Sequence, residues 1–104
     1  MPSALKPAST RLIERYETVA QISRAMRLAA THGDASRFES LSHECRDEID
    51  GLRSAARRQV LRQDERVRRI QLLREILADD AEIRRCTDAG YKRIDAWLSG
   101  ARDR

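Results

Sequence analysis

Apolar residues recur in this chain at alternating steps of four and three positions, and this spacing constrains the fold more than any other feature. One stripe, which includes a serine, consists of Leu12, Tyr16, Val19, Ser23, Met26 and Ala30, and the next of Phe38, Leu41, Cys45, Ile49, Leu52 and Ala56. Because an α-helix completes a turn in about 3.6 residues, this spacing gathers each set on one helix face. The pattern predicts two amphipathic helices.

Capping residues set the expected helix boundaries. A side-chain oxygen of Ser9 or Thr10 can cap the first helix at its start. Gly33, in the run THGD, should close that helix, and Asp34 should cap the second one. A third helix is expected from about Asp64 to Cys86.

Length and composition favour a single helical domain. The chain has 104 residues, of which 4% are aromatic, with four glycines and two prolines. We expect residues 1–104 to form one all-α domain, a small antiparallel bundle of three long helices. Residues 1–9 are expected as a loose N-terminal arm and residues 88–99 as a short fourth helix. No stretch approaches the roughly eighteen apolar residues of a membrane span, so we expect a cytoplasmic protein.

One charged stretch raises the question of whether the chain is an enzyme. Residues 44–59, ECRDEIDGLRSAARRQ, resemble the start of the helical chorismate mutases, which direct arginines into the bundle to hold a dicarboxylate. On an ideal helix the arginines of this stretch point away from the apolar stripe: Arg46, Arg53, Arg57 and Arg58. Glu48 is the one charged residue of the stretch within the apolar arc. We therefore expect no catalytic residues.

The cysteines do not predict a metal site. Cys45 and Cys86 are far apart, and neither has a second cysteine or a histidine at the spacing of metal ligands. We interpret both as small buried thiols. The chain also lacks a glycine-rich phosphate loop, so the sequence indicates neither a metal nor a cofactor.

An arginine-rich block suggests an alternative function. The chain has a formal net charge of +4, and residues 53–74 carry eight arginines against Asp64 and Glu65. Such a block would suit an arginine-rich helical protein that associates with nucleic acid or regulates transcription. Few aromatic residues are available for base stacking. The favoured interpretation of the block is a solvated helix face. A surface for an acidic protein partner is a further interpretation. Direct nucleic-acid binding is not expected.

The third predicted helix carries more apolar surface than one packing seam needs. One stripe consists of Leu72, Ile76 and Ile83, and a second of Val67, Ile70, Leu73, Leu77 and Ala81. Together they cover about 220° of the helix, so the surface must meet a fourth helix, a second subunit or a bound partner. The expected fourth helix offers an apolar side formed by Tyr91, Ile94, Trp97 and Leu98. The sequence leaves these alternatives, including a homodimer, open.

The order of these stripes resembles a known family. The run YETVAQISRAMRLAATHGDASRFESLSHECRDEIDGL, an arginine-rich connection and the run QLLREILADDAEIRRCTD are similar to the FliT family of flagellar export chaperones. The resemblance covers roughly residues 12–98. It implies a helical bundle that binds the filament-cap protein in the cytosol and delivers it to the type III export gate. It also implies contacts with the flagellar master transcription regulator, the export ATPase and its coiled-coil partner.

The resemblance also implies where partners bind. The cargo surface would lie on the third helix, at Val67, Ile70, Leu73, Arg74 and Leu77. We add Leu72 and Ile76 to this expected surface because they belong to the adjoining apolar stripe. The C-terminal helix, with Ile94 and Trp97, would cover part of the surface.

Overall fold

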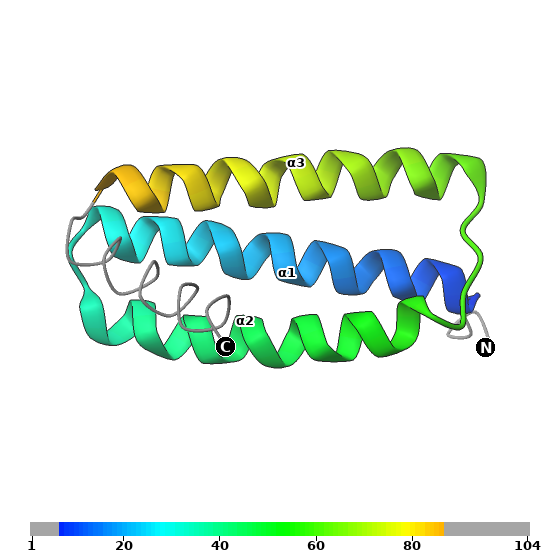
Figure 1. Ribbon diagram of the computed structural model, residues 1–104, viewed down its shortest axis with the longest axis horizontal. Helices are drawn as coiled ribbons and strands as arrows, with labels where there is room; N and C mark the ends of the chain where they lie inside the picture. Colours follow the sequence, from blue (N-terminus) through cyan, green and yellow to red (C-terminus); the bar gives the residue numbers. More distant parts are fainter. Residues whose placement is uncertain (1–6, 87–104) are drawn as a thin grey trace, which may run out of the picture.

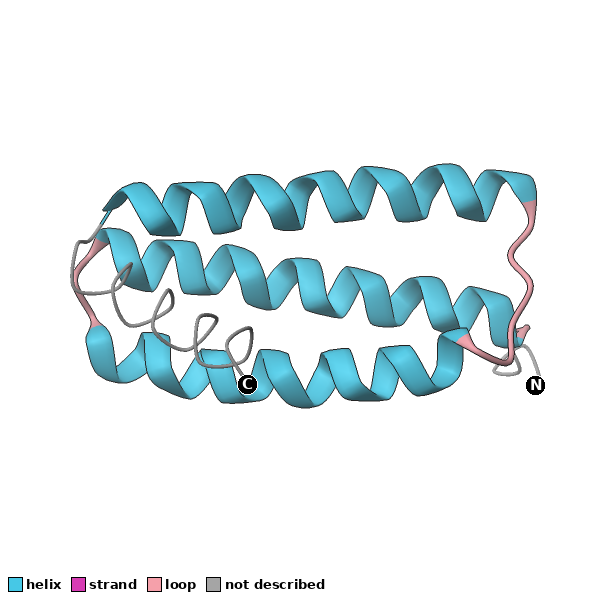
Figure 2. Cartoon of the chain, viewed as in Figure 1, coloured by secondary structure: helices cyan, strands magenta, loops and turns pink. Residues whose placement is uncertain are grey.

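The computed structural model describes residues 7–86, and these residues form three α-helices. They are α1 (Ala8–Thr31), α2 (Ala35–Ala56) and α3 (Gln63–Cys86), and no strand occurs among the described residues (Figure 2). The predicted all-α fold with three long helices is confirmed. The expected fourth helix, at residues 88–99, lies outside the described residues. None of the helices within residues 7–86 is long and apolar enough to cross a membrane.

The central position in the bundle belongs to α1. It packs against both α2 and α3, whereas α2 and α3 barely approach each other (Figure 1). Consecutive helices are antiparallel, and α1 and α3 run in the same direction, because Ser9 contacts Glu65 at one end and Thr31 contacts Cys86 at the other. The connection at residues 57–62 therefore carries the chain across the N-terminal end of α1.

The turn between α1 and α2 forms as the sequence predicts. Gly33 has a φ of 71°, and its N–H donates to the carbonyl of Ala30 at 3.1 Å. The N–H of Asp34 donates to the carbonyl of Ala29 at 2.9 Å, which completes a Schellman motif. The Asp34 carboxylate then accepts a hydrogen bond from the N–H of Arg37 at 3.1 Å and caps α2.

The predicted cap of α1 is wrong. The helix begins at Ala8, Pro7 takes the N-cap position, and no side chain caps the helix. Ser9 and Thr10 lie inside the helix, and their hydroxyls donate to Oε2 of Glu65 at 3.1 and 3.4 Å. In the folded chain these hydroxyls reach a carboxylate acceptor on another helix. A local sequence pattern does not show such a distant acceptor. The last two residues assigned to a loose arm, Ala8 and Ser9, are therefore helical.

Glu65 connects the start of α3 to the start of α1 through hydrogen bonds. Its side chain is buried, and its Oε1 accepts a hydrogen bond from the N–H of Arg62 at 2.9 Å. This hydrogen bond is the main reason why the pKa of Glu65 lies below its ordinary value, and the Ser9 hydroxyl and the Arg62 guanidinium lower it further. The ionised carboxylate thus links the beginning of α3 to the beginning of α1.

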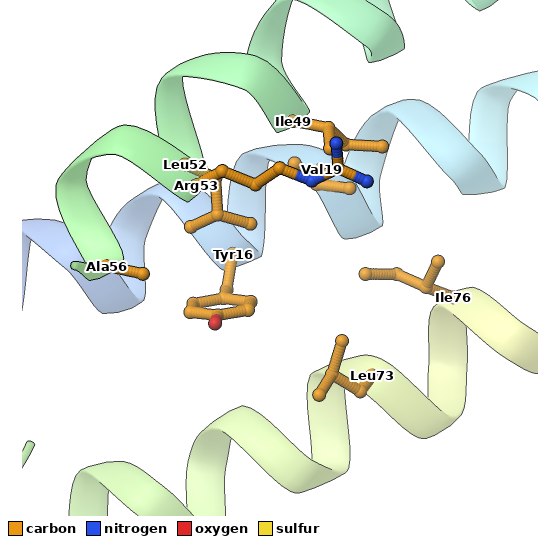
Figure 3. A pocket seen from close by; sticks show the side chains of 8 residues that line it. All are labelled: Tyr16, Val19, Ile49, Leu52, Arg53, Ala56, Leu73 and Ile76. Carbon is orange, nitrogen blue, oxygen red and sulfur yellow. The ribbon is translucent and has the colours of Figure 1, made fainter.

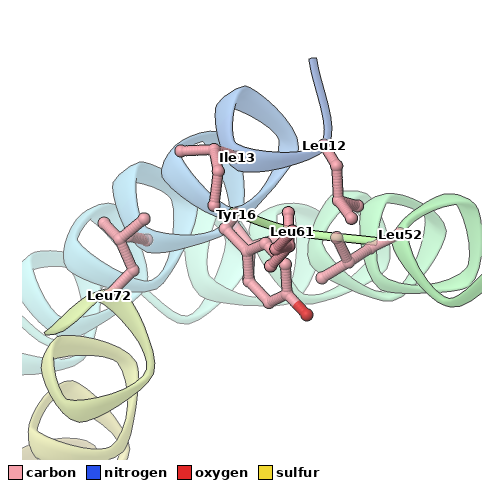
Figure 4. Close-up of a cluster of buried hydrophobic side chains, with 8 residues drawn as sticks. Leu12, Ile13, Tyr16, Leu52, Leu61 and Leu72 are labelled. Carbon is pink, nitrogen blue, oxygen red and sulfur yellow. The ribbon is translucent and has the colours of Figure 1, made fainter. Parts of the chain in front are cut away.

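The core consists of two clusters of buried apolar side chains along α1. Leu61, from the connection before α3, points inward and lies beside Tyr16 in the first cluster (Figure 4). That cluster comprises Leu12, Ile13, Tyr16, Val19, Ala20, Leu52, Leu61 and Leu72. The second comprises Ile22, Ala29, Ala30, Phe38, Leu41 and Ile83. The breadth of the apolar surface of α1 is explained by its central position, since it buries one side against each neighbour.

A polar contact between α1 and α3 involves Asp79, which lies along α3 between Leu72 of the first cluster and Ile83 of the second. The buried hydroxyl of Ser23, a member of the first predicted stripe, donates to Oδ2 of Asp79 at 2.8 Å. Nε of Arg27 donates to the other carboxylate oxygen, also at 2.8 Å. A hydrogen-bonded ion pair has narrower geometric requirements than apolar packing, so these residues fix the register of α3 against α1.

Gly51, in the interior of α2, is a site where a substitution should stabilise the bundle. A Cβ at this position would meet only the guanidinium of Arg15, with the nearest atom at 3.0 Å, and no backbone. Arg15 is exposed and can move aside. We expect Gly51→Ala to raise the free energy of unfolding by about 0.5–1 kcal/mol in urea denaturation, because alanine is the better residue in a helix interior. A loss of stability would show that Arg15 holds a fixed and necessary position.

Candidate partner-binding groove

The apolar residues of α3 divide into a buried and an exposed set. Leu72 and Ile83 point towards α1 and are each only 2% exposed. Four large apolar side chains on the rest of the helix are at least 40% exposed: Val67, Ile70, Leu73 and Leu77. Leu77 is the most exposed of the four, at 66%. The described bundle therefore leaves one apolar side of α3 open.

A groove lies beside this open side. It has a volume of about 260 Å³ and runs between α2 and α3 over a floor formed by α1 (Figure 3). Its lining residues are Tyr16, Val19, Ile49, Leu52, Arg53, Ala56, Leu73 and Ile76. Leu73 and Ile76 project from α3 into the space that the Tyr16 ring enters from α1 (Figure 3). The groove exists because α2 and α3 both pack on α1 and hardly on each other.

The groove and the exposed residues form one continuous surface. Leu73 lines the groove and is itself 40% exposed, so it belongs to both. Leu77 lies one turn further along the same face of α3, and Ile70 lies three residues before Leu73. Val67 lies three residues before Ile70 and continues the row around the outer side. We call Val67, Ile70, Leu73 and Leu77 the exposed apolar row.

Two polar groups stand in the otherwise apolar groove. Tyr16 is buried as a residue, and its hydroxyl makes no hydrogen bond to any other described residue. The side chain of Arg53 extends from α2 past Val19 (Figure 3). Within residues 7–86 its guanidinium has no carboxylate partner. A few polar groups in an apolar groove are typical of binding sites, where they orient the ligand.

The structure distributes the expected partner-binding residues over different environments. Arg74 is exposed, beside the exposed apolar row, and Ile76 is half-buried in the groove. Leu72 packs in the first core cluster and contributes to the fold instead of the open surface, because it faces α1 directly. The expected covering residues lie outside the described part of the chain: Tyr91, Ile94, Trp97 and Leu98.

Sequence reasoning did not identify the groove residues of α1 and α2 as part of a site. Tyr16, Val19 and Ile49 belong to the predicted stripes, which indicated only a buried face. The available signal was a tyrosine in such a stripe, since its hydroxyl needs a partner or water when the ring is buried.

The remaining candidates for chemistry give no reactive cluster. Glu48 is half-buried, and Cys45 and Cys86 are free thiols that are only partly buried. Burial, followed by the charges of Glu44 and Glu48, raises the pKa of the Cys45 thiol, which disfavours the reactive thiolate. Among the described residues no group of three or more histidine, cysteine or acidic side chains could hold a metal ion.

Comparison with known proteins finds one matching family model. The family model described as "Flagellar protein FliT" matches residues 13–104, which is most of the chain. The match includes the groove residues from Tyr16 onwards and the whole exposed apolar row. Neither a curated protein nor a solved structure gives a significant match.

Proposed function

We propose that this chain, which belongs to the FliT family of flagellar proteins, is an export chaperone for the filament-cap protein. The family is one of flagellar chaperones and not of enzymes. In the cytoplasm the chain would hold the cap protein's C-terminal segment, prevent premature association and deliver the cargo to the type III export apparatus. The resemblance of the sequence to this family supports the proposal.

The observation that carries the proposal is the exposed apolar row beside the groove. An amphipathic helix from another protein can place its apolar face against such a surface. Leu73, Leu77 and Ile76 would be covered together, while Tyr16 and Val19 form the floor of the groove. Burial of large apolar side chains supplies roughly 25 cal/mol per Å² of apolar area. The surface therefore favours a function in binding a partner helix.

Further partners are part of the proposal on the basis of the family alone. They are the flagellar master transcription regulator, the export ATPase and the coiled-coil partner of that ATPase. Binding of the regulator would couple the supply of cargo to flagellar gene expression. The outer side of α3, where Arg74 lies, and the groove side give two surfaces on which different partners could bind.

We also propose that the C-terminal segment competes with cargo. Tyr91, Ile94, Trp97 and Leu98 have the spacing of an apolar helix face and could occupy the groove in place of cargo. The apparent affinity for cargo is then reduced by the fraction of the chaperone that is open.

The experiment that tests the proposed function is calorimetry with the C-terminal segment of the cap protein. The full chain should bind this segment, and a variant that ends at Asp88 should bind it more tightly, because the competing segment is gone. Circular dichroism checks that the truncated bundle remains helical. Absence of binding by both folded proteins contradicts the chaperone function. Unchanged or weaker binding by the truncated protein contradicts competition alone, and self-association of the full chain at the groove would assign the surface to a homodimer.

A further inference from the structure

The arginines of this bundle are distributed unequally between its two sides. On the side of α1 and α3 that faces away from the groove, arginines pair with acidic residues of the neighbouring helix. These ion pairs are Arg24–Glu75 at 3.6 Å, Arg27–Asp79 at 2.8 Å and Arg68–Glu17 at 3.4 Å. The positive charge on that side is therefore neutralised within the bundle.

Three arginines on the groove side form no such pair within residues 7–86. Arg53 lines the groove, and Arg57, the C-cap residue that directly follows α2, lies four residues further along the chain. Across the groove, Arg69 lies one turn before Leu73 on α3. Among the described residues none of these three arginines forms an ion pair. Nε of Arg69 is buried and makes no hydrogen bond within the described structure.

We propose that the groove selects an amphipathic partner helix whose apolar stripe is bordered by acidic residues on both edges. Carboxylates on one edge would pair with Arg53 and Arg57, and carboxylates on the other with Arg69. This inference rests on the proposed function, because it specifies the chemistry of the segment that the same groove binds. Unpaired charges of one sign on both rims favour a ligand of the opposite sign and penalise a basic one.

The geometry favours a protein helix over a nucleic acid. The floor between the arginines is formed by Tyr16, Val19, Ile49 and Leu52, and apolar side chains bury poorly against phosphates. Arg53 lines the groove and Arg69 lies one turn before the groove residue Leu73, so the flanks of a docked helix would come near both arginines. A planar guanidinium can pair with a carboxylate through two hydrogen bonds. The Tyr16 hydroxyl supplies one further donor from the floor.

The test compares arginine variants of the full-length chain by calorimetry with the synthetic C-terminal segment of the cap protein. At low salt, Arg53→Gln and Arg69→Gln should each weaken binding by about 3- to 10-fold, as expected for charge pairs at a partly buried rim. Arg24→Gln, on the opposite side, is the matched control and should bind as the wild type does. High salt should reduce the difference between wild type and variants, because screening weakens the charge pairs. Circular dichroism confirms that each variant is folded.

A second peptide separates the outcomes. When the acidic residues of the segment are replaced by their amides, wild type and arginine variants should bind it equally, which identifies the carboxylates as the partners. If the wild type binds the unmodified segment and both variants bind it equally well, charge selection is wrong while the chaperone function stands. If the wild type does not bind the segment, both proposals fail. If the wild type binds duplex DNA as tightly as the segment, and Arg53→Gln loses the DNA, the groove is a phosphate site instead.

Discussion

Replacing Leu77 by aspartate should lower the affinity for the cap-protein segment by at least about 100-fold. Leu77 is 66% exposed in the described structure, so most of its side-chain surface is available for burial under a docked helix. The substitution removes roughly 1.5–3 kcal/mol of apolar burial. It also places an unpaired carboxylate in the interface, which costs further free energy. Each 1.4 kcal/mol corresponds to a tenfold change in affinity, so the two effects together exceed two orders of magnitude.

The matched control for this prediction is Leu28→Asp. Leu28 is 47% exposed and lies on α1, and it neither lines the groove nor belongs to the exposed apolar row. Both variants introduce the same charge at an exposed leucine of a helix, so both should fold. Calorimetry should show that only Leu77→Asp loses binding. Equal losses in the two variants, or full binding by Leu77→Asp, would place the cargo elsewhere on the molecule.

Replacing Leu72 by alanine should lower the free energy of unfolding by about 2–5 kcal/mol. Leu72 is 2% exposed and packs against α1 in the first core cluster. Truncation leaves a cavity that rigid helices fill only partly, and domains of this size have about 5–15 kcal/mol of stability in total. Urea denaturation followed by circular dichroism measures the loss. This loss should exceed in size the stability changes expected for Gly51→Ala and Leu77→Ala.

The same truncation at Leu77 is the control, since it changes the same residue type in the same helix. Leu77→Ala should alter the free energy of unfolding by no more than about 0.5 kcal/mol, because the side chain is mostly in solvent. A large loss at Leu77 would show that another part of the chain covers it in solution. A small loss at Leu72 would contradict the packing of α3 on α1.

The sequence predicted local features well where a short motif controls them. The steps of three and four predicted all three described helices, and Gly33 with Asp34 predicted the turn between α1 and α2. Such features depend on neighbours within a turn or two, which a sequence shows directly. The cap of α1 failed for the opposite reason. Ser9 contacts Glu65, which is 56 residues away, and no local rule contains that contact.

Only the tertiary structure decided which helix is covered and which is open. The sequence showed that the third helix has a broad apolar surface. Periodicity gives the angle that a surface spans on its own helix, but says nothing about how many neighbours that helix acquires. The connection at residues 57–62 carries α3 across the end of α1, so α1 buries both of its sides. The row at Leu73 and Leu77 stays exposed beside a groove because α2 and α3 meet the same central helix and hardly meet each other.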